Sequence, residues 1–250
     1  MKTVKHFTIA FILVLVVWQL VIWIGGYPEA LLPPPLAVGK GIVALVSDGT
    51  LFTHVQISMF RFLSGYLTAV VVAVVLGLIL GRSPKVWAIV DPVIQVLRPV
   101  APVAWAPFIV LWFGIGNMPA IVIIFIAAFF PVLLSTVSAV KKIDPTYLKI
   151  AENLEMKQPA QLFKIIFPAA FPYIANGLHI AVGTAWIFLV AGEMIGAQSG
   201  LGYLIIDSRN ALDLDLVLAG IIFIGVLGLL LDKAIGLFER WVGRQWGVQG

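Results

Sequence analysis

The sequence contains no cysteine, and only 11% of its 250 residues are charged. The absence of cysteine excludes disulfides, thiol chemistry and cysteine-ligated metals. Soluble domains carry about 25% charged residues, so the low charge excludes an ordinary water-soluble fold. The sequence also lacks the G-x-x-x-x-G-K-[ST] phosphate loop and the H-E-x-x-H metal motif. We therefore expect no enzyme activity and no cofactor or metal bound by this chain.

Apolar residues are abundant: they make up 61% of the sequence, and the mean hydropathy is +1.07. This composition indicates an all-α, polytopic membrane protein. The first apolar stretch follows two lysines, as in a signal peptide, but its apolar core is too long and no cleavage site follows, so we expect a retained helix. Six stretches have the length of a spanning helix, namely Phe7–Ile24, Phe62–Leu80, Val86–Phe113, Ala120–Val140, Tyr173–Ile195 and Leu216–Leu237.

The basic residues are distributed unevenly between the two sides of these spans. Twelve of the 16 Lys and Arg residues fall on the side of the N-terminus, three (Lys40, Arg61 and Arg209) on the other, and Arg98 within the third span. This bias predicts that both termini are cytoplasmic. It also explains the net charge of +4 without a nucleic-acid partner, because no basic patch with interleaved aromatic residues is present.

Two segments on the external side have their own organisation. The Pro-rich stretch Gly25–Pro35 predicts an extended linker, followed by an amphipathic helix at Leu36–Val46. Further on, Gly200–Gly202 predicts a turn. We expect a single transmembrane domain over residues 1–250, with core spans at about 62–240 and the first span and linker in residues 1–61.

A polar segment between the fourth and fifth spans predicts a helix-turn-helix elbow on the cytoplasmic side. Asp144 is suited to cap a helix that has Pro145 at its first position. Pro159 begins a second short helix, and we expect Pro168 to end it. Such an elbow could bind a partner, or it could be an amphipathic helix lying in the lipid headgroups.

The third span contains Pro99, Pro102 and Pro107, so a continuous helix is not expected. Broken backbone in a membrane lies inside a bundle or beside an aqueous path, although a merely kinked helix would also fit. Ionisable residues within spans are candidates for function. Arg98, His179 and Glu193 are candidate pathway residues, of which Arg98 or His179 could meet an anionic substrate in transit. Alternatively, Arg98 is satisfied by an acid or by carbonyls, and Glu193 fixes an external gate.

Three regions of the sequence resemble the inner-membrane permease subunits of binding-protein-dependent ABC importers. The elbow matches the family pattern E-A-A, three residues, Gly, and a later I-x-L-P, through Ala151, Ile165 or Ile166, and Pro168. The stretch GEMIGAQSGLGYLI after the fifth span, and the third and fourth spans, are similar to the group that handles aliphatic sulfonates, taurine and nitrate. The pattern's Glu, first Ala and Gly are replaced by Lys149, Ile150 and Glu155, and the turn would then shift onto the residues before Pro159.

The resemblance implies a fold like that of type I ABC importer permeases, six spans with a cytoplasmic coupling elbow. It also implies a homodimer that conducts a small anionic solute, with an external substrate-binding protein and separate ATPase subunits. In that family the elbow inserts into the ATPase, which implies coupling residues Ala151, Glu152, Leu154, Glu155, Met156, Phe163, Ile166 and Pro168.

Two other functions fit a polytopic membrane protein. A secondary transporter driven by an ion gradient would usually show internal repeats, and the two halves of this sequence show no convincing similarity. A scaffold that anchors a cytoplasmic partner would not need a Pro-broken span or intramembrane charges.

Overall fold

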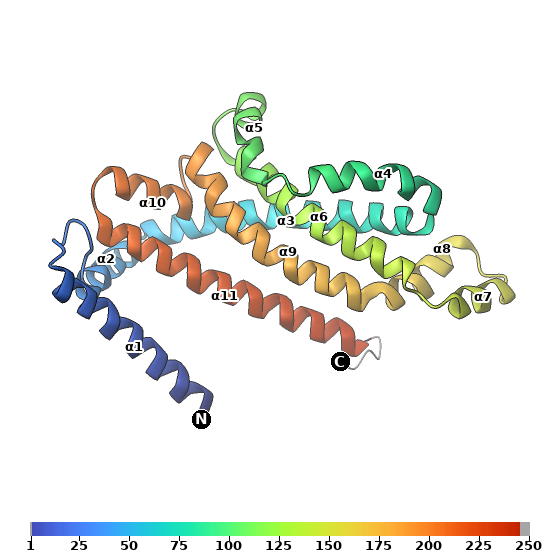
Figure 1. Cartoon of the computed structure of the whole chain (residues 1–250), viewed down its shortest axis with the longest axis horizontal. Helices are drawn as coiled ribbons and strands as arrows, with labels where there is room; N and C mark the ends of the chain where they lie inside the picture. Colours follow the sequence, from blue (N-terminus) through green and yellow to red (C-terminus); the bar gives the residue numbers. More distant parts are fainter. Residues whose placement is uncertain (1, 246–250) are drawn as a thin grey trace. The chain divides into compact units, whose positions relative to one another are not determined.

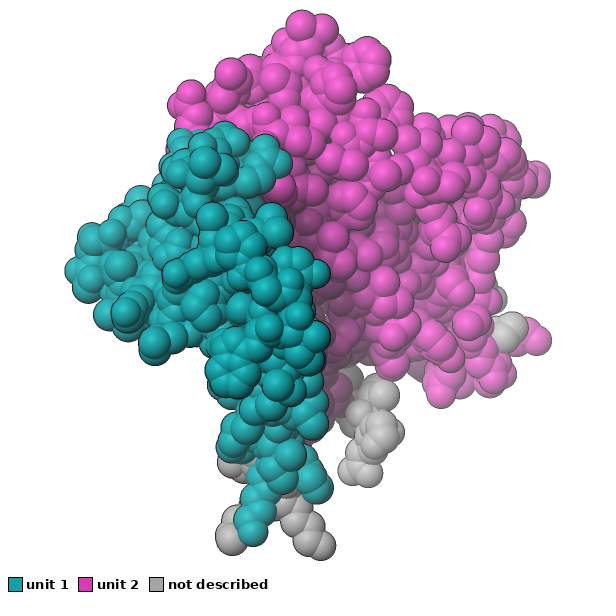
Figure 2. All heavy atoms as spheres, turned by 60° about the vertical axis from the view of Figure 1, so that its left-hand side comes forward, with its two compact units in different colours: residues 1–58, 199–226 teal, residues 59–198, 227–250 magenta. Residues whose placement is uncertain are grey.

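The computed structural model describes residues 2–245, and the side chains at positions 2–4, 7, 145, 148, 152, 158, 159, 163 and 245 lie outside the described part. Every regular element among the described residues is a helix. The chain forms two compact units, coloured separately in Figure 2: unit 1 comprises residues 1–58 and 199–226, and unit 2 comprises residues 59–198 and 227–250.

Unit 1 holds the first helices and a later hairpin. The amphipathic helix predicted after the Pro-rich linker is confirmed as α2, which begins at Pro35. The turn predicted over Gly200–Gly202 is confined to Gly200, which has a φ of 102°, because Leu201 and Gly202 are already the first residues of α10. The sequence did not predict α10 itself. The helices of this unit are α1 (Lys2–Gly25), α2 (Pro35–Ser47), α10 (Leu201–Asn210) and the first parts of α3 (Thr50–Arg82) and α11 (Leu214–Gln245).

Unit 2 is built around α6 (Asn117–Lys141), which packs against α9 (Phe167–Gly196) along much of its length (Figure 1). Gly177 of α9 faces Ser135, and Gly192 faces Ala120, so the two helices are antiparallel. Because glycine has no side chain, the backbones approach closely at these positions.

A second line of glycines joins α3 to α6. Gly65 faces Ile124, Gly77 faces Thr136, and Gly81 faces Val140. The partners follow each other in the same order and at the same sequence separation, so α3 and α6 are parallel. The small residues of α3 therefore serve packing inside one subunit.

The predicted break in the third span is confirmed. Helix α4 (Pro84–Leu97) and the pair η1 (Pro102–Trp105) and α5 (Ala106–Phe113) are bent by 84° relative to each other. Because α3 and α6 are parallel, the chain between them must return from one end of the bundle to the other. The bent pair makes that return. Among the described residues, five continuous helices are long and apolar enough to span a membrane, and the bent pair would be a sixth if it is counted as one span.

The elbow is present, but its end differs from the prediction. Helix α7 (Pro145–Asn153) is followed by α8 (Gln158–Gln161) and a π-helical turn, η2 (Leu162–Ile166), which leads directly into α9. The prediction that Pro168 ends the second short helix is therefore wrong. Pro168 lacks an amide hydrogen, and the wider turn before it accommodates that missing hydrogen bond without breaking the helix.

Candidate functional site

A cavity of about 520 Å³ opens in unit 2 between α6, α9 and the break after α4. On α6 the lining residues fall in adjacent pairs that recur every four residues, from Ile126 to Ser135, and continue to Ser138 and to Lys142 just after the helix. On α9 they recur every three or four residues from Tyr173 to Phe188, so each set shares one helix face. The cavity, which we call the α6–α9 groove, therefore follows the facing sides of two antiparallel helices. Arg98, from the broken span, also lines it.

The two ends of the groove differ in chemistry. Near the C-terminus of α6 and the N-terminus of α9, the lining is polar, with Ser135, Ser138, Lys142, Tyr173 and Asn176. Towards the opposite ends of these helices, the lining is mostly apolar, with Ile126, Phe130 and Phe188, and includes the hydroxyl of Thr184. Both charged residues of the lining, Arg98 and Lys142, are basic, so the groove carries positive charge.

Lys142 directly follows α6, where the partial negative charge of a helix C-terminus favours a cation. Its ammonium nitrogen lies 5.1 Å from the centre of the Tyr173 ring. The neighbouring Lys141 has a different environment, with its ammonium 4.5 Å from the centre of the Trp87 ring. Among the residues that the structure describes, neither Arg98 nor Lys142 forms an ion pair with a carboxylate.

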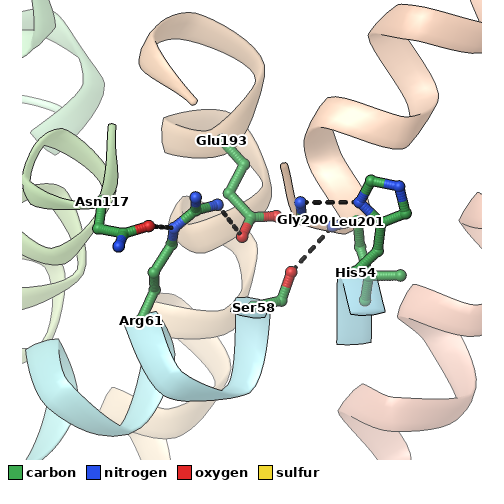
Figure 3. Close-up of polar contacts among 7 residues, drawn as sticks. All are labelled: His54, Ser58, Arg61, Asn117, Glu193, Gly200 and Leu201. Carbon is green, nitrogen blue, oxygen red and sulfur yellow. Dashed lines mark hydrogen bonds and ion pairs between the residues drawn. The ribbon is translucent and has the colours of Figure 1, made fainter. Parts of the chain in front are cut away.

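Glu193 lies in a buried polar cluster in unit 2 and does not line the groove (Figure 3). Its Oε1 is 2.8 Å from Nη1 of Arg61, and Arg61 Nε donates a hydrogen bond of 2.9 Å to Oδ1 of Asn117. Arg61 and Glu193 are each only 1% exposed. Because an unpaired buried charge is costly, this cluster holds α3, α6 and α9 together.

His179 connects α9 to α11 within unit 2. Its Nε2 lies 2.9 Å from Oδ1 of Asp232, and its Nδ1 lies 3.2 Å from Oε2 of Glu239. His179 does not line the α6–α9 groove. The structure therefore places the three candidate pathway residues in three different surroundings and brings only Arg98 to the groove.

In unit 1, two side chains of α3 cap the N-terminus of α10 (Figure 3). The Gly200 amide donates to Nδ1 of His54 over 2.9 Å, and the Leu201 amide donates to Oγ of Ser58 over 2.8 Å. These bonds satisfy amides that a helix N-terminus leaves without intrahelical partners. His54 and Ser58 thereby fix the position of α10 on α3.

The start of the elbow is capped as predicted. The Thr146 amide donates to Oδ1 of Asp144 over 2.8 Å, and Pro145 occupies the first helical position. This backbone hydrogen bond, and then one from the Thr146 side chain, hold the pKa of the exposed Asp144 carboxyl below its usual value. The cap fixes where α7 begins.

The turn of the elbow lies at Glu155, so the expectation that it shifts towards Pro159 is wrong. Glu155 has a φ of +49°, in the left-handed region. The Met156 amide donates to the Ala151 carbonyl over 3.0 Å, which closes α7 in the way a C-terminal glycine normally does. The replaced glycine position thus keeps its conformation with a glutamate.

The elbow's candidate residues divide into anchoring and exposed groups. Ala151 and Ile166 are buried, and Ile166 packs with Leu78 and Val140, so these side chains hold the elbow to unit 2. Leu154 is 67% exposed, and Tyr147 and Ile150 are also exposed on α7. Met156 and Pro168 are half-buried. The side chains of Glu152 and Phe163 lie outside the described residues.

Sequence analysis missed several residues of these sites. The sequence indicates an external loop for Arg61, because the long apolar run begins at Phe62, yet Arg61 is buried inside α3. It indicates a cytoplasmic loop for Lys142, which lines the groove. The spacing of Tyr173, Asn176 and Ile180 is a signal for a shared helix face, but it does not show what that face adjoins.

The comparisons with known proteins agree with this architecture. Residues 69–244 match the family described as "Binding-protein-dependent transport system inner membrane component". The chain belongs to this permease family. It is 35% identical over 227 residues to SsuC of Bacillus subtilis, whose name concerns aliphatic sulfonates transport, covering 91% of this chain and 82% of SsuC. It is 35% identical over 231 residues to the taurine transport system permease protein TauC of Escherichia coli, covering 90% and 84%.

A solved structure supports the permease fold. The chain resembles a chain of the MetNI methionine ABC transporter, solved in inward-facing conformations, with a TM-score of 0.56. The sequences are 18% identical, and the similarity covers 74% of this chain and 96% of that chain. The predicted all-α, polytopic importer permease is therefore confirmed.

Membership of the permease family defines the role of the chain. It is a multi-pass inner membrane subunit of an ABC importer and works with a separate ATPase and a substrate-binding protein. It is a transport subunit and not an enzyme, it binds no cofactor, and ATP is used by the partner. Membership of this family excludes the two other functions considered from the sequence, a secondary transporter and a membrane scaffold.

Proposed function

We propose that this permease conducts a small solute with an anionic group, of the sulfonate, taurine or nitrate kind, through the α6–α9 groove. The observation that carries the proposal is the sign of the groove's charges, since Arg98 and Lys142 are both basic. The names of SsuC and TauC support the same class of solute. An anion leaving water needs compensating charge, which these residues supply.

The proposed assembly is a homodimer in which each chain acts as a single permease domain, residues 1–250. The open side of each groove would face the second copy, so the two grooves together form the pathway. The distribution of basic residues favours cytoplasmic termini. The polar end of the groove then lies towards the cytoplasm, beside the elbow.

We propose that the elbow transmits movement of the ATPase to the pathway. Its exposed apolar residues Tyr147, Ile150 and Leu154 offer the contact surface, and we assign Glu152, Glu155, Met156 and Phe163 to the same interface. Buried Ala151 and Ile166, with Pro168, would connect that surface to α9. A few residues supply most of the energy at interfaces, and tyrosine is among the commonest of them.

The test is reconstitution of the permease with the ATPase and binding protein of its own transport system. The binding protein is loaded in turn with taurine, an alkanesulfonate and nitrate, and ATP hydrolysis is measured. We expect the binding protein loaded with at least one of these solutes to stimulate hydrolysis, with uptake of that solute. Stimulation only by a solute that has no anionic group would contradict the proposed class of solute, and uptake driven by an ion gradient without the ATPase would contradict the whole proposal.

Replacing Leu154 by Asp tests the elbow. Because the new charge would have to be desolvated in the partner's cleft, we expect loss of ATPase co-purification and transport, while the chain still inserts into the membrane. Leu212→Asp is the matched control, since Leu212 is an exposed leucine in unit 1 with a φ of 64° that Asp tolerates. Normal co-purification and transport with Leu154→Asp would show that the elbow is not the coupling site.

A further inference from the structure

We infer that the polar end of the α6–α9 groove is an anion-binding site within the permease itself, built by Lys142, Ser138, Asn176 and Tyr173 and aided by Arg98. The inference rests on the proposed function, in which the groove is the pathway. It adds that the permease selects its solute by charge, separately from the binding protein.

The helix geometry places the four residues at one end of the groove. Ser138 and Lys142 are one helical turn apart at the C-terminal end of α6, and Tyr173 and Asn176 are one turn apart near the start of α9. Since the two helices are antiparallel, these ends adjoin. The contact between Lys142 and the Tyr173 ring confirms that the two helices meet there.

The charge at this end lacks a protein counterion among the described residues. Lys142 is held by its position at the end of α6 and by the Tyr173 ring, neither of which neutralises it. Every other polar lining residue, including Ser138 and Asn176, is uncharged apart from the basic Arg98. Lys142 and Arg98 are both exposed and line the cavity, so a solute anion can reach them and act as their counterion.

The remaining side chains match an anion that has several oxygens. The Ser138 and Tyr173 hydroxyls and the Asn176 amide can each donate a hydrogen bond. Such donors, together with an ammonium, bind sulfonate or carboxylate oxygens strongly. The apolar walls at Ile126, Phe130 and Phe188 can hold a short hydrocarbon tail. The site therefore fits a small organic anion, with an alkanesulfonate as the probe.

The absence of cysteine allows a direct test in the assembled transporter. Ser138→Cys introduces one thiol into this chain, and its modification is followed by the mass of the permease. We compare an anionic reagent, 2-sulfonatoethyl methanethiosulfonate, with its cationic trimethylammonium counterpart. A thiol introduced at an exposed position by Asn210→Cys gives the reference ratio of the anionic to the cationic modification rate.

We expect this ratio to be roughly fivefold higher at position 138 than at position 210, because nearby basic groups attract the anionic reagent.

Three further substitutions, each made in the Ser138→Cys chain, show which basic residue raises the ratio of anionic to cationic modification rates. Lys142→Gln and Arg98→Gln should each lower the ratio roughly threefold or more, because each removes one positive charge from the groove. Lys141→Gln removes the adjacent charge, which lies over Trp87 outside the groove, and should leave the ratio nearly unchanged. An equal effect of Lys141→Gln would show general surface charge and overturn the site.

Competition keeps the inference testable even if a charge variant fails to assemble. 1-Propanesulfonate should slow modification of Ser138→Cys, whereas the neutral propanesulfonamide should not. Equal effects of the two compounds, or a ratio at position 138 equal to the reference, would overturn the anion site. In that case, stimulation of ATP hydrolysis by the loaded binding protein would still support the proposed function. If the loaded binding protein does not stimulate hydrolysis, the proposed function itself is contradicted.

Discussion

At the scale of single residues, Glu155 shows that a fold can hold a non-glycine residue in an unfavourable backbone conformation. The left-handed conformation that closes α7 suits glycine, and a residue with a Cβ pays roughly 1–2 kcal/mol to adopt it. Glu155 nevertheless keeps this conformation, because the hydrogen bond from Met156 to Ala151 and the buried Ala151 hold the turn in place. The elbow therefore retains strain at its turn.

Glu155→Gly should relieve that strain. We expect a local stabilisation of about 1 kcal/mol, since glycine adopts the left-handed region freely but loses more freedom on folding. The amide of Met156 should then exchange with solvent roughly fivefold more slowly, which hydrogen exchange measures directly. Glu155→Ala is the control and should bring no gain. Faster exchange in the glycine variant would contradict the assigned turn.

At the scale of elements, α7 depends on its first turn, because nine residues are too few for an isolated helix to be stable. Asp144 stabilises this turn in its ionised form, as the lowered pKa of its carboxyl shows. A group with a lowered folded-state pKa contributes stability above its usual pKa and loses it as the pH falls through the lowered value.

The start of α7 should therefore weaken on acidification. With the wild-type chain, we expect amide protection in the first turn to be constant above the usual Asp pKa of 3.8 and to fall as the pH drops below it. Asp144→Asn should keep the cap, since Asn also caps helices, but should remove this pH dependence. Protection that stays constant in the wild type through the same acid range would show that ionised Asp144 does not support α7.

The elements also show what the sequence could and could not establish. Hydropathy and proline positions were sufficient for the spans and for the break after α4, since both depend on local chemistry. The start of α3 was placed at Phe62 rather than Thr50, because polar residues such as His54 and Ser58 interrupt the apolar run. In the structure those side chains accept hydrogen bonds from the N-terminus of α10, a contact that is distant in sequence. The groove could not be predicted for the same reason.

At the scale of the whole molecule, the parallel packing of α3 on α6 fixes how the chain crosses the bundle. That packing depends on glycines, because a methyl group at position 77 would lie 2.6 Å from Cβ of Thr136. Any side chain there pushes the two helices apart and disturbs the elements on either side of them.

Gly77→Ala should consequently destabilise the permease by roughly 1–3 kcal/mol, the usual cost of overpacking, and lower its thermal unfolding temperature. Gly183→Ala is the matched control, because no atom lies within 4 Å of a methyl group at that position. Both changes replace glycine within a helix and gain the same helix propensity, so their difference isolates packing. Equal unfolding temperatures would contradict the close approach of α3 and α6.

The unbroken path from α8 through η2 into α9 determines how motion spreads through the permease. The second half of the elbow, α8 and η2, continues into α9 without a break, and Glu193, near the far end of α9, is held by Arg61 of α3. A push on the elbow would thus tilt α9 about its fixed end, and the displacement would be greatest at Tyr173 and Asn176. Movement of the ATPase would widen or narrow the polar end of the groove, so the affinity for the anion would change with the nucleotide bound to the ATPase.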